Sequence, residues 1–434
     1  MRASRLLRFA AIFAGTVIGG VAHAGPYLLV EANSGRVIAQ SDAGRPWYPA
    51  STTKLMTTYV AFQAMRERRV SPSTLIKVSA NALAQPPSKM GFNVGTEVTL
   101  DNAIKMLMVK SANDIAVVIA EGVGGSVESF VMEMNKTAAR LGMTGTHYMN
   151  PHGLPDEYQV TTARDMALLA RAIIQDFPEY ELYFRIPALQ LGKRILRNHN
   201  RLIDHYPGAD GMKTGFICSS GFNVVAGATR NGKRLIAVVF GAYSPSQRAE
   251  DAARLFERGF RRDVTLFPDS HYAVLDTLGN QAGTPEDLRE QMCSGKRKRP
   301  AAESDIDDDD EEDDTQNAAA AGTKAAPKTK QVKQSLLVDL PPSMPPIRIF
   351  TGPVLKLPEP AVTTTATKEK AEKAAAAPAK TEKAAAAPAK TDAKPKPAAA
   401  NTAATTAPAA AKAAPAAKPA AKPVTDTPAP KPKT

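Results

Sequence analysis

Short β-like apolar runs occur in pairs at two places along the chain. Residues 27–32 and 36–40 are separated by an Asn-Ser-Gly turn, and residues 223–229 and 235–240 are separated by a loop that contains Asn231-Gly232. Turns of this kind between apolar runs predict β-hairpins, and Asn-Gly is the strongest such signal. The sequence therefore predicts two hairpins that are far apart in the chain.

Between the hairpins, the apolar residues recur at helical spacing. One helix is expected around residues 55–62, another over residues 104–119 with an interruption at Ser111-Ala112-Asn113, and an amphipathic helix follows over residues 246–262. Residues 25–262 are thus expected to form one globular α/β domain. In this domain a single antiparallel sheet is assembled from the two chain ends, helices flank the sheet, and a helical subdomain is inserted.

The first 24 residues have the composition of a secretory signal peptide. Three arginines precede an apolar run from Phe9 to Val21, and Ala22-His23-Ala24 follows as a small-x-small cleavage site. The run is short for a membrane-spanning helix of about 20 residues, which makes a retained anchor the weaker alternative. We expect secretion across the inner membrane into the periplasm or cell envelope. There Cys218 and Cys293 either form a disulfide or remain free thiols.

The C-terminal part divides into four segments by composition. A helical or irregular extension (residues 263–295) precedes a charged low-complexity linker (296–334), a short apolar and proline-containing segment (335–358) and an Ala/Pro/Lys-rich tail (359–434). The linker carries a long acidic run and the tail has no aromatic residue, so both are expected to be solvated and disordered. The third segment has enough apolar residues to dock on the folded domain.

The net charge of +12 is concentrated outside the globular domain. The first 24 residues carry three arginines and no acidic residue, and residues 361–434 carry 13 lysines against five acidic residues. Residues 25–360 therefore carry a net charge of about +1, which gives a nucleic-acid function little support. The lysines of the tail leave two alternatives open, contact with anionic wall or outer-membrane phosphates and a flexible tail without a partner. The spacing of His and Cys predicts no metal site, and no cofactor is expected.

Ser51 and Lys54 form the first of three motifs that carry chemistry. They lie three residues apart where a helix is expected to begin, so their side chains share one helical face. A serine hydroxyl needs a base to act as a nucleophile at neutral pH. A lysine can be that base if burial or a neighbouring cation lowers its pKa. A second lysine in the same cleft would provide such a cation.

The other two motifs are Ser111-Ala112-Asn113 and Lys213-Thr214-Gly215. The first interrupts a helix and is expected to form a loop at the same cleft, where a hydroxyl can relay a proton and a carboxamide can contact a substrate amide. The second precedes a hairpin, and a strand edge there can pair with an extended peptide. Each motif alone is common, but all three in this order, separated by 60 and 102 residues, form a set known in β-lactamases and penicillin-binding proteins.

On these motifs, residues 26–262 resemble the low-molecular-mass penicillin-binding serine D-Ala-D-Ala carboxypeptidases of peptidase family S11. The matching segments are Pro49–Thr57, Lys110–Asp114, Asn150–Pro155, Thr161–Asp165, Asn198–Leu202 and Asp210–Gly215. The resemblance implies a β-lactamase/transpeptidase-like fold, with the active cleft between a sheet-bearing α/β part and a helical part.

The resemblance also implies a role for each residue of the first two motifs. Ser51 attacks the carbonyl of the penultimate D-alanine of a peptidoglycan stem peptide and forms an acyl-enzyme, and Lys54 accepts its proton. Ser111 passes a proton to the departing D-alanine, and Asn113 positions the substrate. Water then releases the trimmed peptide, with Lys54 again acting as the base.

For the third motif, the resemblance implies that Lys213 and Thr214 hold the terminal carboxylate while Gly215 allows close approach of the substrate backbone. The oxyanion hole is formed by the backbone N–H groups of Ser51 and Phe216. Phe216 stands where some members of the family have a polar residue. Its backbone N–H can still serve in the oxyanion hole, because this role does not depend on the side chain. β-Lactam antibiotics mimic the D-Ala-D-Ala end and are expected to acylate Ser51.

Three other functions use similar motifs. A class A β-lactamase is expected to carry Glu-x-x-x-Asn between the second and third motifs, and this pattern is absent from the sequence. A DD-endopeptidase that cuts D-Ala cross-links uses the same residues and stays open as an alternative. The non-enzyme alternative is an inactive wall module that binds stem peptides, and the retention of Ser51, Lys54 and Lys213 argues against it.

Overall fold

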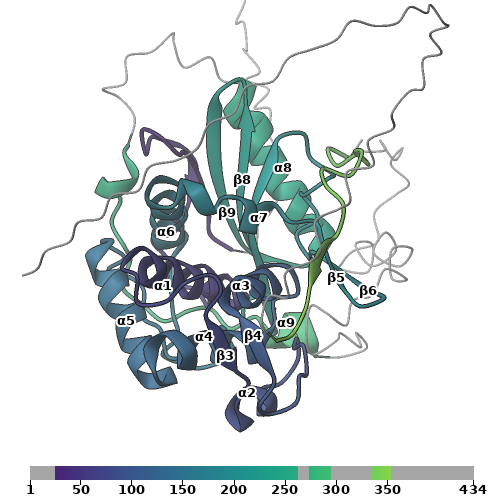
Figure 1. The fold of residues 1–434 in the computed structure, drawn as a ribbon. Helices are drawn as coiled ribbons and strands as arrows, with labels where there is room; N and C mark the ends of the chain where they lie inside the picture. Colours follow the sequence, from purple (N-terminus) through teal and green to yellow (C-terminus); the bar gives the residue numbers. More distant parts are fainter. Residues whose placement is uncertain (1–24, 262–272, 295–334, 353–434) are drawn as a thin grey trace, which may run out of the picture. The chain divides into compact units, whose positions relative to one another are not determined.

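The computed structural model describes residues 25–261, 273–294 and 335–352 (Figure 1). All of them belong to one compact unit of the chain. The predicted signal peptide, the charged linker and the Ala/Pro/Lys-rich tail lie outside the described residues.

A five-stranded antiparallel sheet with the order β2-β1-β9-β8-β7 forms the centre of this unit (Figure 1). Its strands are β1 (Tyr27–Glu31), β2 (Val37–Ser41), β7 (Ala209–Ile217), β8 (Gly221–Arg230) and β9 (Lys233–Ala242). Asn231 and Gly232, with φ angles of 50° and 74°, make the tight turn between β8 and β9, as a two-residue hairpin requires. Because β1 pairs with both β2 and β9, the predicted antiparallel sheet built from both ends of the domain is confirmed, and the described residues form two smaller sheets besides it, β10-β5-β6 and β3-β4.

The two faces of the sheet are covered by different helices. Helix α8 (Pro245–Arg261) packs on one face, where it buries the side chains of Leu29 and Val224. Residues one position away in the strands, such as Leu28, point to the other face because side chains alternate along a strand. There they join the main core with α1 (Lys54–Arg66) and α6 (Ala163–Asp176). The fold is therefore a sheet between a single helix and a larger helical part.

The helical part is inserted between β2 and β7. Besides α1 and α6, its elements are β3 (Leu75–Lys77), α2 (Ala80–Ala84), β4 (Glu97–Thr99), α3 (Leu100–Val109), α4 (Asn113–Gly124) and α5 (Val127–Arg140). Helix α4 is buried from Asn113 to Ala120, so it forms the centre of this part. The predicted interruption separates α3 from α4. Asn113, however, is the first residue of α4 and does not belong to the predicted loop.

Several short elements complete the described part of the chain. They are the 3₁₀ helices η1 (Ala50–Thr53), η2 (Pro178–Tyr180) and η5 (Leu275–Thr277), the helices α7 (Leu182–Arg185) and α9 (Arg289–Cys293), and the strands β5 (Ala188–Leu191), β6 (Arg194–Arg197) and β10 (Ile347–Ile349). No single helix among the described residues is long and apolar enough to cross a bilayer, and α4 and α5 reach that criterion only as a pair bent by 84°.

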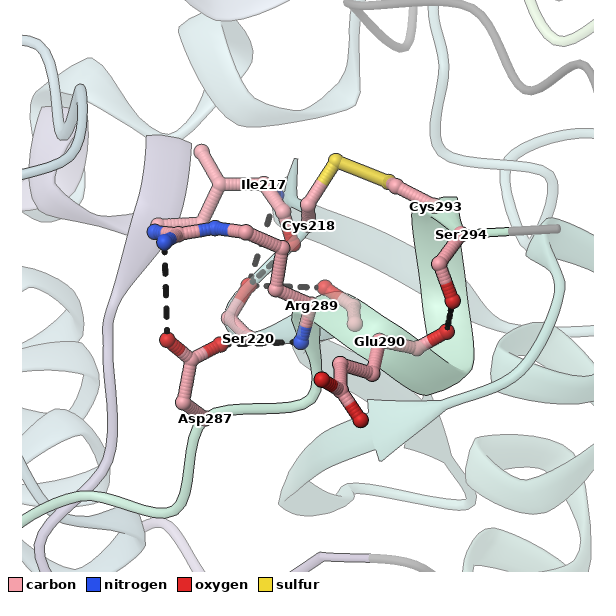
Figure 2. The surroundings of a disulfide bond; sticks show 9 residues. Ile217, Cys218, Ser220, Asp287, Arg289, Glu290, Cys293 and Ser294 are labelled. Carbon is pink, nitrogen blue, oxygen red and sulfur yellow. Dashed lines mark hydrogen bonds and ion pairs between the residues drawn. A yellow bond between two sulfur atoms is a disulfide. The ribbon is translucent and has the colours of Figure 1, made fainter.

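Residues 273–294 return to the sheet. Val274 forms an isolated bridge with Arg36 next to β2, and Cys293 at the end of α9 forms a disulfide with Cys218 just after β7 (Figure 2). Of the two alternatives for these cysteines, the structure therefore has the disulfide. The bond fixes the end of this segment beside the strand that carries the third motif.

Residues 335–352 also lie against the folded unit. Strand β10 pairs in parallel with β5, and Ile349 is 4% exposed. Leu336 and Leu337 pack at the α8 face of the sheet, and the N–H of Gly352 donates to the carbonyl of Glu97. This segment thus adds a strand to the small sheet formed by β5 and β6.

Candidate active site

Ser51 lies in the 3₁₀ turn η1, and Lys54 is the first residue of α1 directly behind it. The Lys54 side chain is fully buried, and its Nζ is 2.8 Å from Ser51 Oγ, 2.8 Å from Asn113 Oδ1 and 2.7 Å from the carbonyl oxygen of His152. An ammonium group has three donors, and each of them has an acceptor here. The arrangement fixes the amine against the serine hydroxyl, which is the geometry that a nucleophile and its base require.

Two glycines allow the chain to close tightly around Ser51. A Cβ atom on Gly153 (φ +86°) would lie 1.8 Å from the carbonyl oxygen of Ala50, and one on Gly215 would lie 2.6 Å from the nitrogen of Ser51. Ala50 itself has a φ of 48°, a left-handed conformation that an alanine rarely adopts. The loop after α5 and the strand β7 therefore contact the turn that presents Ser51, and both contacts require glycine.

Ser111 and Asn113 flank the start of α4 and face the same site. Ser111 is 4% exposed, and its hydroxyl has no hydrogen-bond partner among the described residues. The Asn113 amide nitrogen donates to the carbonyls of Pro86 (3.0 Å) and Pro87 (3.1 Å), while its oxygen accepts from Lys54. Asn113 thus connects Lys54 to the loop between α2 and β4, and only one lone pair of its oxygen remains for a substrate.

The third motif lies on β7, an edge strand of the five-stranded sheet. Lys213 and Thr214 are buried, 2% and 1% exposed, and Lys213 Nζ donates to the carbonyl of Thr214 (3.0 Å). The Phe216 ring stacks on Phe222 with a centroid distance of 4.2 Å, so the side chain is occupied with packing. The backbone of β7 is hydrogen-bonded to β8 on one side only, which leaves its outer edge as a strand-pairing surface in the described sheet.

A pocket of about 220 Å³ opens in front of Ser51. Of the predicted site residues, it is lined by Ser51, Ser111, Asn113 and Phe216, whereas Lys54, Lys213, Thr214 and Gly215 do not line it. The first motif and the second are joined directly through Lys54. The third motif is joined to the first by the close contact of Gly215 with Ser51.

Three residues at the pocket or beside it were not predicted as functional from the sequence. His152 and His199 were noted only as parts of matching segments, and Arg289 has no local signal; of the three, His199 and Arg289 line the pocket. Burial, and secondly the positive charge of Lys54, lower the pKa of His152 to about 3. The imidazole is therefore neutral at physiological pH, and its Nδ1 accepts a hydrogen bond from the N–H of Leu154 (3.2 Å). This holds the loop that contains Gly153.

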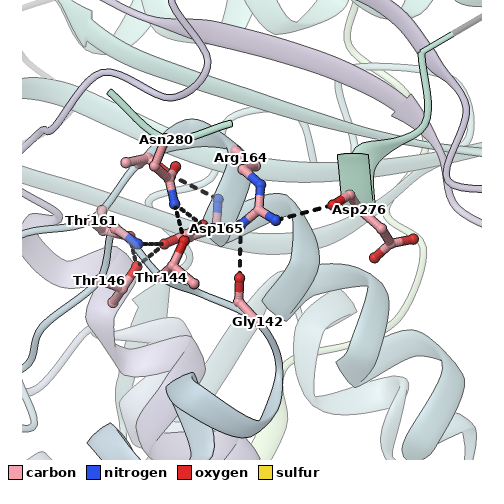
Figure 3. Close-up of polar contacts among 10 residues, drawn as sticks. Gly142, Thr144, Thr146, Thr161, Arg164, Asp165, Asp276 and Asn280 are labelled. Atoms are coloured by element: carbon pink, nitrogen blue, oxygen red, sulfur yellow. Dashed lines mark hydrogen bonds and ion pairs between the residues drawn. The ribbon is translucent and has the colours of Figure 1, made fainter. Parts of the chain in front are cut away.

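The base of that loop is fixed by a buried polar network around Asp165 (Figure 3). Arg164 Nη1 lies 2.7 Å from Asp165 Oδ1 and also donates to the carbonyl of Gly142 (2.8 Å). The other carboxylate oxygen accepts from the N–H of Gly145 and the hydroxyl of Thr146, both at 2.8 Å. Asn280, from the returning segment, donates to Asp165 at 3.1 Å. The network connects α6 to the chain that leads into residues 150–155.

Comparison with known proteins gives a consistent picture. The profile of the family described as D-alanyl-D-alanine carboxypeptidase matches residues 17–244. The carboxypeptidase DacC of Escherichia coli is 36% identical over 249 residues (56% of this chain and 62% of that protein), and DacA of the same organism is 36% identical over 262 residues (58% and 65%). The chain thus spans slightly less than two thirds of the length of these curated relatives.

Solved structures agree with the sequence relatives. The structure of the D-alanyl-D-alanine carboxypeptidase DacD from Francisella tularensis matches with a TM-score of 0.54 and 28% identity, covering 60% of this chain and 74% of that one. Penicillin binding protein 5 from Haemophilus influenzae matches with a TM-score of 0.52 and 33% identity, covering 54% and 70%. Because the family profile covers more than half of the sequence and includes the first, second and third motifs, the chain belongs to the D-alanyl-D-alanine carboxypeptidase family.

Proposed function

We propose that the protein is a serine-type D-Ala-D-Ala carboxypeptidase that removes the terminal D-alanine from peptidoglycan pentapeptide stems. The observation that carries this proposal is the 2.8 Å contact between Ser51 Oγ and the buried Nζ of Lys54 at the wall of an open pocket. Family membership supports the same reaction.

In the acylation step, Ser51 Oγ attacks the carbonyl carbon of the penultimate D-alanine while its proton passes to Lys54 Nζ, which must be an uncharged amine at that moment. The negative charge that develops on the carbonyl oxygen is stabilised by the backbone N–H groups of Ser51 and Phe216. The C–N bond then breaks, and the nitrogen of the departing D-alanine receives a proton through the Ser111 hydroxyl. The absence of a partner for that hydroxyl among the described residues supports the relay role.

In the deacylation step, water attacks the ester carbonyl and gives its proton to Lys54, and Ser51 leaves as the alcohol. Substrate binding is assigned to the edge of β7, where Lys213 and Thr214 hold the terminal carboxylate and Gly215 admits the substrate backbone. Asn113 supports Lys54 by its 2.8 Å contact and positions the substrate through its remaining lone pair. β-Lactams acylate Ser51 by the same first step.

The cellular setting is part of the proposal. Residues 1–24 act as an export signal, so the enzyme works in the periplasm or cell envelope, where the Cys218–Cys293 disulfide is stable. Residues 25–262 are the catalytic domain, followed by the extension to residue 295, the linker to residue 334 and the docking segment to residue 358. For the lysine-rich tail, residues 359–434, both alternatives stay open, contact with anionic wall or outer-membrane phosphates and a tail without a partner.

The test uses the exported form of the full chain, a fluorescent penicillin and diacetyl-Lys-D-Ala-D-Ala. We expect a label on Ser51 that clears slowly, together with release of D-alanine, and neither result with Ser51→Ala. A protein that is neither labelled nor active would overturn the proposal. Fast clearing of the label would indicate a β-lactamase, and cleavage of D-Ala cross-linked dimers without release of D-alanine from the monomer would indicate an endopeptidase.

A further inference from the structure

One residue that lines the active-site pocket lies beyond the segment that matches the family profile. The profile ends at residue 244, whereas Arg289, the first residue of α9, lines the pocket together with Ile217 and Cys218 at the end of β7. Figure 2 shows the Arg289 side chain extending towards Ile217. The chain therefore places a cation at the pocket from an element that the shared catalytic domain does not include.

The position of α9 is fixed by several independent contacts. The disulfide joins Cys293 to Cys218, and the N–H of Leu288 donates to the carbonyl of Ser219 (3.0 Å). Leu288 and Met292 are buried, 1% and 0% exposed. The backbone at Arg289 is thus held beside the pocket, while its side chain, 63% exposed, can still adjust to a ligand.

The charges around Arg289 favour an anion. No carboxylate is found among the described residues that line the pocket. Just outside it, Asp287 Oδ2 lies 3.8 Å from Arg289 Nη1, and both side chains are about half exposed or more. An ion pair of this length at the surface contributes little, so the guanidinium keeps donors for a second carboxylate.

The direction of the substrate determines which of its groups reaches Arg289, and this step rests on the proposed function. A peptide whose terminal carboxylate is at Lys213 and whose scissile carbonyl is at Ser51, beside Gly215, runs antiparallel to β7. Each preceding residue lies about 3.4 Å further towards Ile217. The residue before D-Ala-D-Ala is therefore opposite the end of β7, where Arg289 lies.

We propose that Arg289 is a specificity residue which selects stem peptides that carry a carboxylate on the side chain of the residue preceding D-Ala-D-Ala. A guanidinium can bind such a carboxylate in a bidentate manner, whereas it repels the ammonium group of a lysine at the same position. The substrate class assigned to the site is thus a peptide with an acidic third residue counted from its C-terminus.

The proposal is tested with three peptides of the form acetyl-X-D-Ala-D-Ala, in which X is L-2-aminoadipate, L-norleucine or L-lysine. These side chains are similar in length and differ in charge. For the wild type, kcat/KM is expected to be highest with aminoadipate and lowest with lysine. Arg289→Gln should reduce the ratio of kcat/KM between the aminoadipyl and norleucyl peptides about 10- to 150-fold, which is the range for one hydrogen bond to a charged group.

Two further variants sharpen the test. Asp287→Asn removes the competing carboxylate but keeps an oxygen for the N–H of Arg289, so it should increase the preference for aminoadipate. Arg261→Gln, at an exposed arginine at the end of α8, is the matched loss of a positive charge and should leave the ratio unchanged. If Arg289→Gln hydrolyses the norleucyl peptide but leaves the aminoadipyl/norleucyl ratio of kcat/KM unchanged, the inference about Arg289 is wrong and the proposed function still stands. If no peptide releases D-alanine and penicillin does not label Ser51, the proposed function fails and the inference fails with it.

Discussion

Lys54 Nζ lies 2.8 Å from Oγ of Ser51, which lines the pocket, and Lys54 has no solvent-exposed surface. Three acceptors surround this amine, and they come from three different parts of the chain. They are the Ser51 hydroxyl, the Asn113 side-chain oxygen and the carbonyl of His152. The position of Lys54, the proposed base for Ser51, is therefore defined by the tertiary fold.

Lys54→Met should abolish the activation of Ser51 while keeping a side chain of similar length. We expect the rate of acylation by fluorescent penicillin to fall by about 10² to 10⁴, the usual contribution of a general base. The Ser51→Ala/Lys54→Met double variant should be no less active than Ser51→Ala alone, because the two residues act as a unit. A Lys54→Met protein that is acylated within a few-fold of the wild-type rate, with an unchanged melting temperature, would contradict the role of Lys54.

Gly153→Ala should damage both stability and activity. The added Cβ would meet the carbonyl oxygen of Ala50 at 1.8 Å in a left-handed conformation, so the turn that holds Ser51 must move. We expect a loss on the order of 3 kcal/mol in the free energy of unfolding and at least a tenfold slower acylation. Gly142→Ala is the matched control, since Gly142 has a φ of +72° with nothing within 4 Å of the added atom. This variant should lose only about 1 kcal/mol and keep its acylation rate. Equal effects of the two variants would show that the contact with Ala50 is unimportant.

Much of the fold and of the site follows from local sequence signals. Asn231-Gly232 fixes a hairpin because these residues tolerate positive φ, and the i, i+3 spacing of Ser51 and Lys54 places both side chains on one face of a helix. The motif around Ser111 was predicted at the cleft, and Asn113 does contact Lys54. These features depend on a few neighbouring residues, so they can be recognised without the fold.

Other features depend on contacts between distant segments and leave no local pattern. The pairing of Cys218 with Cys293 spans 75 residues, and Arg289 lines the pocket because this disulfide and the contacts of Leu288 and Met292 hold α9 beside β7. The Asn113 amide nitrogen donates to the carbonyls of Pro86 and Pro87, and these carbonyls are placed by a loop whose sequence has no periodic hydrophobic pattern. Only the spatial structure supplies this information.

His152 should make the folded protein sensitive to acid. Its pKa of about 3 in the folded state is below the ordinary value of 6.5, so between these values the unfolded chain binds a proton that the folded protein does not bind. The stability is therefore fully present above pH 6.5 and falls with decreasing pH by about 1.4 kcal/mol per unit from this group. Between pH 7 and pH 5, the wild type should lose about 2 kcal/mol more than His152→Asn in urea unfolding. His147→Asn, at an exposed histidine, controls for the loss of an imidazole. A difference between wild type and His152→Asn that does not change with pH would contradict this account.

Ile349→Ala should loosen the segment of residues 335–352 from the folded unit. Ile349 is buried on β10, which pairs with β5, and truncation of a buried isoleucine costs about 2–5 kcal/mol. We expect the segment to detach while the rest stays folded, so that the loss of stability is limited by the free energy with which the segment docks. We therefore expect faster hydrogen exchange at residues 335–352 and a small change in melting temperature.

The control for Ile349→Ala is Val338→Ala, in the same segment at a side chain that is 49% exposed. Its hydrogen exchange should stay close to that of the wild type, because a half-exposed valine contributes less apolar burial. Acylation of Ser51 should be unaffected in both variants, since neither residue lines the pocket. If Ile349→Ala lowers the melting temperature as much as a core substitution and leaves exchange of the segment slow, the segment is an integral part of the cooperative unit and not a docked addition.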